Sequence, residues 1–162
     1  MRILLASFAL ATLSACGLSP MYAGGGSGAV AQSLAAIEVA PIEGRAGWLV
    51  RSALEERFAA AGNPAPRYRI EVRLDDQLDG LAVLRNDTIS RERRTLRARY
   101  QLIDLATGDI VLDATDESDA GIDVVSSEYA VIAAEQTALE NLSQDLAQRI
   151  VTRVALALRK QQ

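Results

Sequence analysis

Two stretches in the middle of the chain alternate between apolar and polar residues, which is the pattern of a half-buried β-strand. In residues 67–74 the apolar positions are Tyr68, Ile70, Val72 and Leu74. In residues 93–102 they are Leu96, Ala98, Tyr100 and Leu102. Shorter apolar runs over residues 34–40, which Pro41 ends, and over residues 110–115 predict two further strands. Asp79-Gly80 predicts a two-residue hairpin turn, although Asn86-Asp87 also favours a break and leaves the register from Leu81 to Ser90 open.

Two other stretches carry apolar residues at helical spacing. Residues 48–61 show a stripe at Trp48, Leu49, Ser52, Ala53, Glu56, Ala59 and Ala60, and Gly62-Asn63-Pro64 ends this helix. A longer helix over about residues 127–159 has its stripe at Ile132, Leu139, Leu142, Leu146, Ile150, Val154 and Leu158, and Ser126 or Ser127 is placed to cap it. The order β-α-β-β-β-α predicts an α+β fold. We expect a two-layer sandwich in which a four-stranded, mostly antiparallel sheet carries two helices on one face.

The first residues of the chain have the features of a secretory signal. Met1-Arg2 is followed by an apolar run of 11 residues, Ile3 to Leu13, which is about half the ~20 residues that a membrane-spanning helix needs. Leu13-Ser14-Ala15-Cys16 resembles the bacterial lipobox, in which the signal is cut before the cysteine and the cysteine is acylated. By the same resemblance, Gly17 at the next position indicates delivery to the outer membrane. The alternative is an ordinary secreted protein that is cut after Ala15 and keeps a free thiol.

The domain organisation follows from this start. Residues 1–15 are the predicted lipoprotein signal peptide, and Cys16 is the predicted lipid anchor. Residues 16–33 contain Gly24, Gly25, Gly26, Ser27 and Gly28, which is typical of a flexible tether. Residues 34–162 then form a single α/β domain. No stretch after the signal is apolar enough to predict a membrane-spanning helix.

Composition excludes several classes of function. The 162 residues include no histidine and one cysteine, so imidazole-based catalysis, an internal disulfide and multi-cysteine metal sites are excluded. A net charge of −4 disfavours a nucleic-acid binder. The acidic group Asp113, Asp116, Glu117, Asp119 and Asp123 lacks the spacing of a calcium loop, and a solvated loop is the favoured interpretation. We therefore predict no enzyme, no metal and no cofactor; a lipid-anchored hydrolase that uses carboxylates is the least favoured class.

The basic residues are concentrated and almost all are arginine. Lys160 is the single lysine among 17 basic residues, and nine arginines lie between Arg67 and Arg99. The alternation places Arg91, Arg93, Arg97 and Arg99 on the polar side of one strand, and Arg69 on the neighbouring strand would widen this surface. Such planar, bidentate cations suit phosphates and carboxylates. The alternatives are a solvated sheet face, ion pairs with the acidic C-terminal half, and edge charge that deters aggregation.

Three short segments resemble the LptE family of lipopolysaccharide-assembly lipoproteins. Cys16-Gly17-Leu18-Ser19-Pro20-Met21-Tyr22 is similar to the family's mature start, Cys-Gly-Phe-x-Pro-x-Tyr, with Leu18 in place of phenylalanine. The middle matches at Arg94, Leu96, Tyr100, Leu102, Asp104 and Thr107-Gly108. Ser127-Glu128-Tyr129-Ala130, together with Ala133-Ala134-Glu135, resembles the start of the family's last helix.

The resemblance implies a specific, non-catalytic function. LptE proteins are small α/β sandwiches that plug the outer-membrane barrel LptD and bind lipopolysaccharide while it is inserted into the outer leaflet. The implied partners are an LptD-like barrel, lipopolysaccharide and the membrane through acylated Cys16, with no nucleic acid. Lipopolysaccharide-binding residues chosen from the alternation, and not transferred from the family, are Arg69, Arg91, Arg93, Arg97 and Arg99. The alternative function is an auxiliary lipoprotein of an ABC-type lipid transport system.

Overall fold

Eight elements follow one another in the computed structural model, which describes residues 28–83 and 89–161. In chain order they are α2 (Ala29–Ala35), β1 (Ile37–Val39), α3 (Gly44–Phe58), the 3₁₀ turn η3 (Ala59–Ala61), β2 (Tyr68–Val83), β3 (Ile89–Asp104), β4 (Ile110–Asp123) and α4 (Glu128–Arg159). The predicted signal peptide and Cys16 lie outside the described residues.

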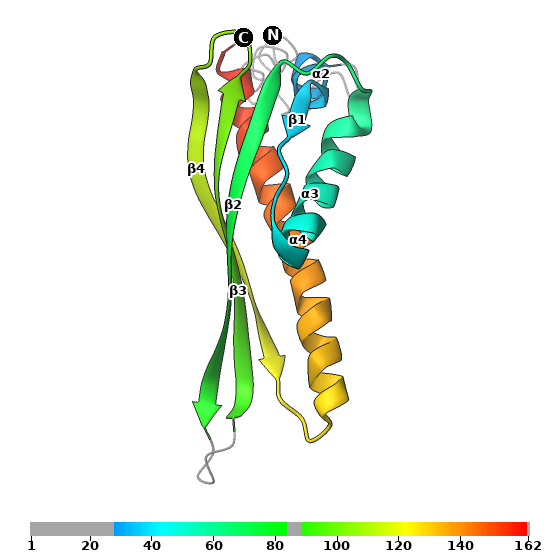
Figure 1. Ribbon diagram of the computed structural model, residues 1–162, viewed down its shortest axis with the longest axis vertical. Coiled ribbons are helices and arrows are strands. Elements are labelled where there is room, and N and C mark those ends of the chain that lie inside the picture. The colour runs from blue at the N-terminus through cyan, green and yellow to red at the C-terminus, as the bar shows by residue number, and fades with distance from the viewer. Residues whose placement is uncertain (1–27, 84–88, 162) are drawn as a thin grey trace, which may run out of the picture.

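The four strands form one sheet in the order β1-β2-β3-β4. β1 runs parallel to β2, and the pairs β2–β3 and β3–β4 are antiparallel. Figure 1 shows a long, twisted sheet with α3 and α4 on the same face. The predicted α+β sandwich with a mostly antiparallel sheet is confirmed, and the short α2 is added to the two helices that we expected.

The alternating residues of β2 and β3 form the sheet side of the core. The inward positions that are buried are Tyr68, Ile70, Val72, Leu96, Ala98, Tyr100 and Leu102. They belong to one hydrophobic cluster with Val50, Leu54 and Phe58 of α3 and with the apolar stripe of α4. The period-two pattern therefore identified the buried face of both strands correctly.

Helix α4 begins where its capping residue predicts. The Ser127 hydroxyl accepts a hydrogen bond from the Ala130 N–H at 3.4 Å. Six of the seven residues of the predicted stripe are buried, from Leu139 to Leu158. Ile132 is 45% exposed, because the first turns of α4 extend past the region that α3 covers (Figure 1).

The N-terminal part of the domain differs from the prediction. We expected tether up to Ser33 and a strand from Leu34, but residues 29–35 form helix α2 and β1 is limited to Ile37–Val39. The segment is rich in alanine, which favours a helix. Leu34 and Ala35 are buried, and α2 contacts α4. Burial of this short helix outweighs the flexibility that the preceding glycines indicated.

Helix α3 begins at Gly44, four residues before the predicted start, and presents a different face to the core. Trp48 is 66% exposed, whereas the helix buries Gly47, Val50, Ala53, Leu54 and Phe58. A Cβ atom at Gly47 would lie 2.6 Å from the Ile42 carbonyl oxygen, so this position accepts only glycine without a shift of the backbone. The predicted stripe through Trp48 is wrong apart from Ala53, because Val50, Leu54 and Phe58, spaced by four residues, form the apolar side that faces inward.

The predicted hairpin turn at Asp79-Gly80 is also wrong. β2 continues to Val83, with Asp79 opposite Arg93 and Gly80 opposite Glu92. A register shift follows Gly80, which is the irregularity that a glycine in a strand often marks. The connection between β2 and β3, including Asn86-Asp87, lies outside the described residues.

Strand β4 is longer than predicted and contains the acidic group that we expected in a solvated loop. It runs from Ile110 to Asp123 instead of ending at Thr115. Because β4 pairs with β3 over this whole length, the carboxylates occupy defined register positions: Glu117 and Asp123 lie opposite Arg97 and Arg91, and the other outward ones lie diagonally from arginines. The loop prediction failed because a run of acids has low strand propensity, and cross-strand partners override that preference.

Candidate functional site

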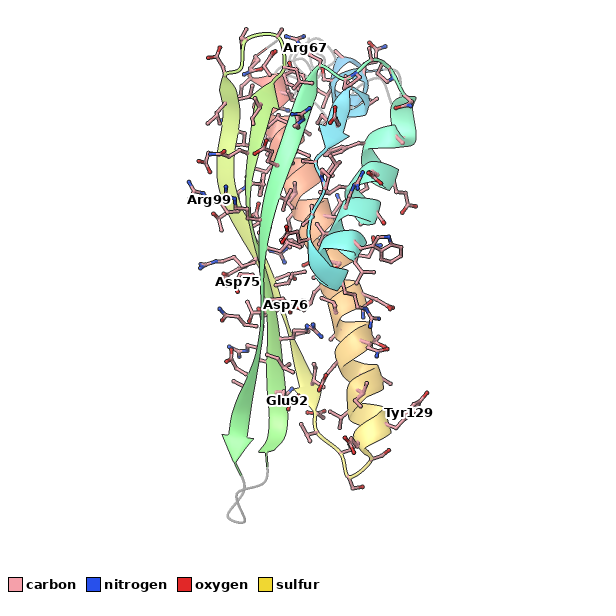
Figure 2. The ribbon with its side chains drawn as sticks, in the orientation of Figure 1. Arg67, Asp75, Asp76, Glu92, Arg99 and Tyr129 are labelled. Atoms are coloured by element: carbon pink, nitrogen blue, oxygen red, sulfur yellow. The ribbon has the colours of Figure 1, made fainter. Side chains whose placement is uncertain are left out.

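Four of the predicted binding arginines form a row on the outer face of the sheet, the face that points away from α3 and α4. This arginine row consists of Arg91, Arg93, Arg97 and Arg99, at alternate outward positions of β3. Figure 2 shows Arg99 and Asp75 on the outer face and Asp76 on the side of the helices. Arg69 lies on β2 opposite Ile103, four residues beyond Arg99 in the register, so the structure places it past the end of the row.

Every arginine of the predicted site faces a carboxylate of the same chain. On the row, the ion pairs are Arg91–Asp123 at 3.5 Å, Arg93–Asp119 at 3.7 Å, Arg97–Glu117 at 3.3 Å and Arg99–Asp113 at 3.1 Å. Arg69 Nε lies 3.3 Å from Glu38 Oε1 of β1. The row is therefore not a free positive surface. Intramolecular ion pairing, one of the alternatives from sequence, describes these side chains.

The outer face as a whole carries slightly more negative than positive charge. Its described outward positions on the four strands include the arginines Arg69, Arg73, Arg91, Arg93, Arg97 and Arg99. The carboxylates on the same positions are Glu38, Glu71, Asp75, Asp79, Asp113, Glu117, Asp119 and Asp123. A face with six cations and eight anions does not attract polyanions over long distances, but it presents many donors at short range.

The ion pairs of the row are exposed to solvent. The hydrogen bond from Arg99 to Asp113 is the main cause that lowers the pKa of the Asp113 carboxyl, so this pair is formed at neutral pH. Exposed pairs contribute little to stability and exchange partners at low cost. A ligand phosphate at this face would have to replace a carboxylate that is already bound.

A second set of polar residues lies on the helix side of the sheet, and the sequence analysis missed it. Arg94 donates to both carboxylate oxygens of Asp76, at 2.8 and 2.6 Å, and to the Glu135 carbonyl oxygen at 3.0 Å. Together these hydrogen bonds link β2, β3 and α4. The hydrogen bond from Arg94 to Asp76 raises the pKa of the Arg94 guanidinium. The signal was present, because Arg94 and Asp76 occupy inward positions of strands on which most inward residues are apolar.

A further inward network joins β3, β4 and α4 near the middle of the core. The Tyr100 hydroxyl donates to Asp116 Oδ2 at 2.6 Å, and Arg153 contacts Asp116 Oδ1 at 2.8 Å. Burial and this hydrogen bond raise the pKa of Tyr100 well above its ordinary value. The Ser118 hydroxyl donates to Asp145 Oδ2 at 2.6 Å, which is the main cause that lowers the pKa of Asp145. These contacts hold β4 against α4.

Two features are absent from the described part of the chain, a metal-binding cluster and a membrane-spanning helix. Residues 28–83 and 89–161 contain no group of three or more histidine, cysteine, aspartate or glutamate residues arranged to hold a metal ion. Within the same residues, no helix combines the length and hydropathy needed to cross a membrane.

The fold is shared with several solved bacterial lipoproteins. A lipoprotein from Caulobacter crescentus CB15 aligns with a TM-score of 0.63 and 23% identity, over 80% of this chain and 96% of that one. The rare lipoprotein B from Shewanella oneidensis aligns with a TM-score of 0.60 and 10% identity, over 76% of this chain and 95% of that one. A minor lipoprotein from Acinetobacter baumannii gives a TM-score of 0.57 and 12% identity, over 74% and 90% of the two chains.

The comparison with protein families is more specific than these structural matches, which establish the fold alone. A search of curated protein sequences finds no match for the chain. The LptE family model, described as lipopolysaccharide-assembly, matches residues 34–154 and so spans all of the strands and most of α4. On this match and the shared fold, the chain belongs to the LptE family of lipopolysaccharide-assembly proteins.

Proposed function

We propose that the protein is a non-catalytic outer-membrane lipoprotein, anchored on the periplasmic side through acylated Cys16. In this proposal it plugs an LptD-like β-barrel, helps to assemble that barrel, and binds lipopolysaccharide during its insertion into the outer leaflet. The observation that carries the proposal is the family match over residues 34–154, on a chain whose start resembles a lipobox. The five predicted arginines take part through short-range contacts, since their charge is already balanced.

The outer face of the sheet suits the lumen of a barrel. The interior of a large outer-membrane barrel is polar. A face on which five of the six arginines are already paired with carboxylates brings little uncompensated positive charge into such a lumen, and it presents donors and acceptors to polar residues of the barrel. Enclosure would also protect β4, a long edge strand with no neighbour on its second side among the described residues, from pairing with other chains.

The end of the domain that lies away from α2 carries exposed apolar side chains. These are Leu78, Leu81, Val125, Tyr129 and Ile132, and Tyr129 is 84% exposed. Figure 2 shows Tyr129 near the start of α4, at the opposite end of the fold from α2. Exposed apolar residues that gather at one end of a domain favour contact with a partner. We assign this end to contact with the barrel.

Membrane fractionation and co-purification test the anchor and the partner. Replacing Cys16 with serine is expected to release the protein from membranes, and unchanged fractionation would contradict the anchor. Wild-type acylated protein, solubilised in mild detergent, is expected to co-purify with one large outer-membrane β-barrel. Recovery of inner-membrane transport components in place of a barrel would instead support the auxiliary ABC-type lipoprotein.

A pair of opposed variants tests lipopolysaccharide binding at the arginine row. The first variant carries glutamine at Arg93, Arg97 and Arg99. The second carries the neutral amides at the partner carboxylates Asp113, Glu117 and Asp119. If ligand phosphates exchange with these carboxylates, the first variant binds lipopolysaccharide several-fold more weakly and the second several-fold more tightly at low salt. Equal affinities for wild type and both variants, with unchanged circular dichroism spectra, would refute a role for the row.

A further inference from the structure

A groove of about 670 Å³ lies between β4 and the C-terminal half of α4. Leu112 and Asp116 line it from β4, and Arg149, Arg153, Leu156 and Lys160 are among the residues that line it from α4. It opens at the side of the sheet where β4 has no further strand neighbour among the described residues. Its size is in the range of pockets that hold small molecules or lipid headgroups.

The groove has an excess of positive charge, unlike the outer face. Three cations and one carboxylate line it, and Asp145 beside it pairs with Arg149, so two of the three positive charges are offset and one remains, in a chain with a net charge of −4. Both oxygens of Asp116 are engaged, one by the Tyr100 hydroxyl and one by Arg153. Arg149 contacts Asp145 through Nε alone, at 3.0 Å, so its terminal N–H groups remain available. The negative end of the α4 dipole amounts to about half a charge and offsets only part of this excess.

One wall of the groove is apolar. Leu112 is partly buried against the core, and Leu156 is 38% exposed on α4. Leu156 falls between Arg153 and Lys160 on the helix, so apolar and cationic side chains alternate along one side of the groove. A purely ionic ligand would make no use of the leucines, and a purely apolar one would leave the cations without partners. The lining therefore fits an amphiphile with an anionic head.

The groove lies at the same end of the domain as the start of the described chain, which indicates that the amphiphile is a lipid of the membrane that holds the anchor. Figure 1 shows α2 and the end of α4 at the same end of the fold. The described chain begins at Gly28, twelve residues after Cys16, and twelve extended residues reach at most roughly 40 Å. An anchor at Cys16, which is part of the proposed function, therefore holds this end of the domain near the membrane surface.

We propose that this groove binds the headgroup of an anionic phospholipid from the leaflet that holds the anchor. The lipid phosphate lies among Arg149, Arg153 and Lys160, and the first methylene groups of an acyl chain lie against Leu112 and Leu156. Because the protein as a whole is acidic, its affinity for an anionic membrane comes from this groove. The contact orients the domain with the end of α4 toward the membrane.

Vesicle sedimentation tests the proposal with the mature chain, residues 16–162, carrying Cys16→Ser so that no acyl group contributes. The probes are vesicles of phosphatidylcholine alone, of phosphatidylcholine with phosphatidylglycerol, and of phosphatidylcholine with lipid A. Each basic residue near an anionic membrane surface contributes roughly a factor of five to binding, so Arg149→Gln with Lys160→Gln is expected to weaken binding to the phosphatidylglycerol vesicles roughly thirtyfold. The control, Arg45→Gln with Arg51→Gln on α3, makes the same change in net charge on exposed helical positions and is expected to leave binding unchanged.

Four results would overturn the assignment. They are an equal loss in the groove variant and in the α3 control, no loss in either, displacement of the protein by inorganic phosphate at matched ionic strength, and a loss confined to vesicles that contain lipid A. Since the assay omits the acyl anchor, its result does not depend on whether Cys16 is acylated in the cell. A groove variant that still co-purifies with the barrel would separate a failure of the groove from a failure of the proposed function.

Discussion

Replacing Asp76 with leucine is expected to lower the free energy of unfolding by about 2 kcal/mol, although the aspartate is not part of the apolar core. The substitution leaves the Arg94 guanidinium without the carboxylate that accepts two of its hydrogen bonds. The Arg94 side chain is 16% exposed and that of Asp76 is 27% exposed. Removing one partner of a fully buried pair costs about 3–5 kcal/mol, and removing one partner of an exposed pair costs about 0–1 kcal/mol. The partial burial places this pair between the two limits.

The double variant Asp76→Leu with Arg94→Met shows whether the loss of stability comes from an arginine left without its partner or from the loss of the ion pair itself. Because it replaces both charges with apolar side chains that fill much of the same space, its stability is expected to lie within about 1 kcal/mol of wild type. The assay is urea unfolding followed by far-ultraviolet circular dichroism, with the slope of the transition checked for constancy. As a control, Asp119→Leu removes an exposed carboxylate on β4 and is expected to leave the midpoint unchanged. The reasoning is refuted if the Asp76 variant unfolds at the wild-type midpoint, or if the double variant is less stable than the single one.

Three other changes have expected outcomes that the same unfolding assay measures. Gly47→Ala places a Cβ atom 2.6 Å from the Ile42 carbonyl oxygen. It is expected to lower the free energy of unfolding by about 1–2 kcal/mol, even though alanine has the better helix propensity. An unchanged unfolding midpoint would contradict the close approach. Ser127→Ala removes a cap whose hydrogen bond is long, 3.4 Å, so a loss of about 0.5 kcal/mol is expected, and a loss several times larger would mean that the serine has another role. The pKa of Asp145 is lowered in the folded state, so its contribution to stability is complete above its unfolded value of about 4 and is lost as the pH falls through the lower folded value. The stability difference between wild type and Asp145→Asn should therefore be constant near neutral pH and shrink below about pH 4, and a difference that grows on acidification would refute this assignment.

The elements with a clear burial period were predictable from sequence. The alternation in residues 67–74 and 93–102 identified the inward and outward sides of β2 and β3, because side chains of a strand point to opposite faces in turn. The same logic placed the five candidate arginines on the outer face. The stripe of α4 was equally plain, since a long helix that packs on one side repeats its apolar residues at three and four positions.

The partners of those arginines were not predictable in the same way. Asp119 and Asp123 read as part of a loop, because acidic residues disfavour strands when each is considered alone. Asp123 lies opposite Arg91 and Asp119 lies diagonally from Arg93 because of the β3–β4 register, which depends on pairing over a distance of some 30 residues in the chain. The Arg94–Asp76 pair could have been found, because its two residues interrupt an apolar face at inward positions. A charged residue at such a position is an indication that a partner lies across the interface.

Trp48 provides an optical probe of the surface of α3. It is the single tryptophan of the chain, and two thirds of it is exposed to water in the isolated domain. Its fluorescence is therefore expected to change little when the core unfolds and to shift to shorter wavelength when another molecule covers α3. Enclosure of the domain by a larger protein can thus be followed in solution from the emission of the native chain, without an attached dye.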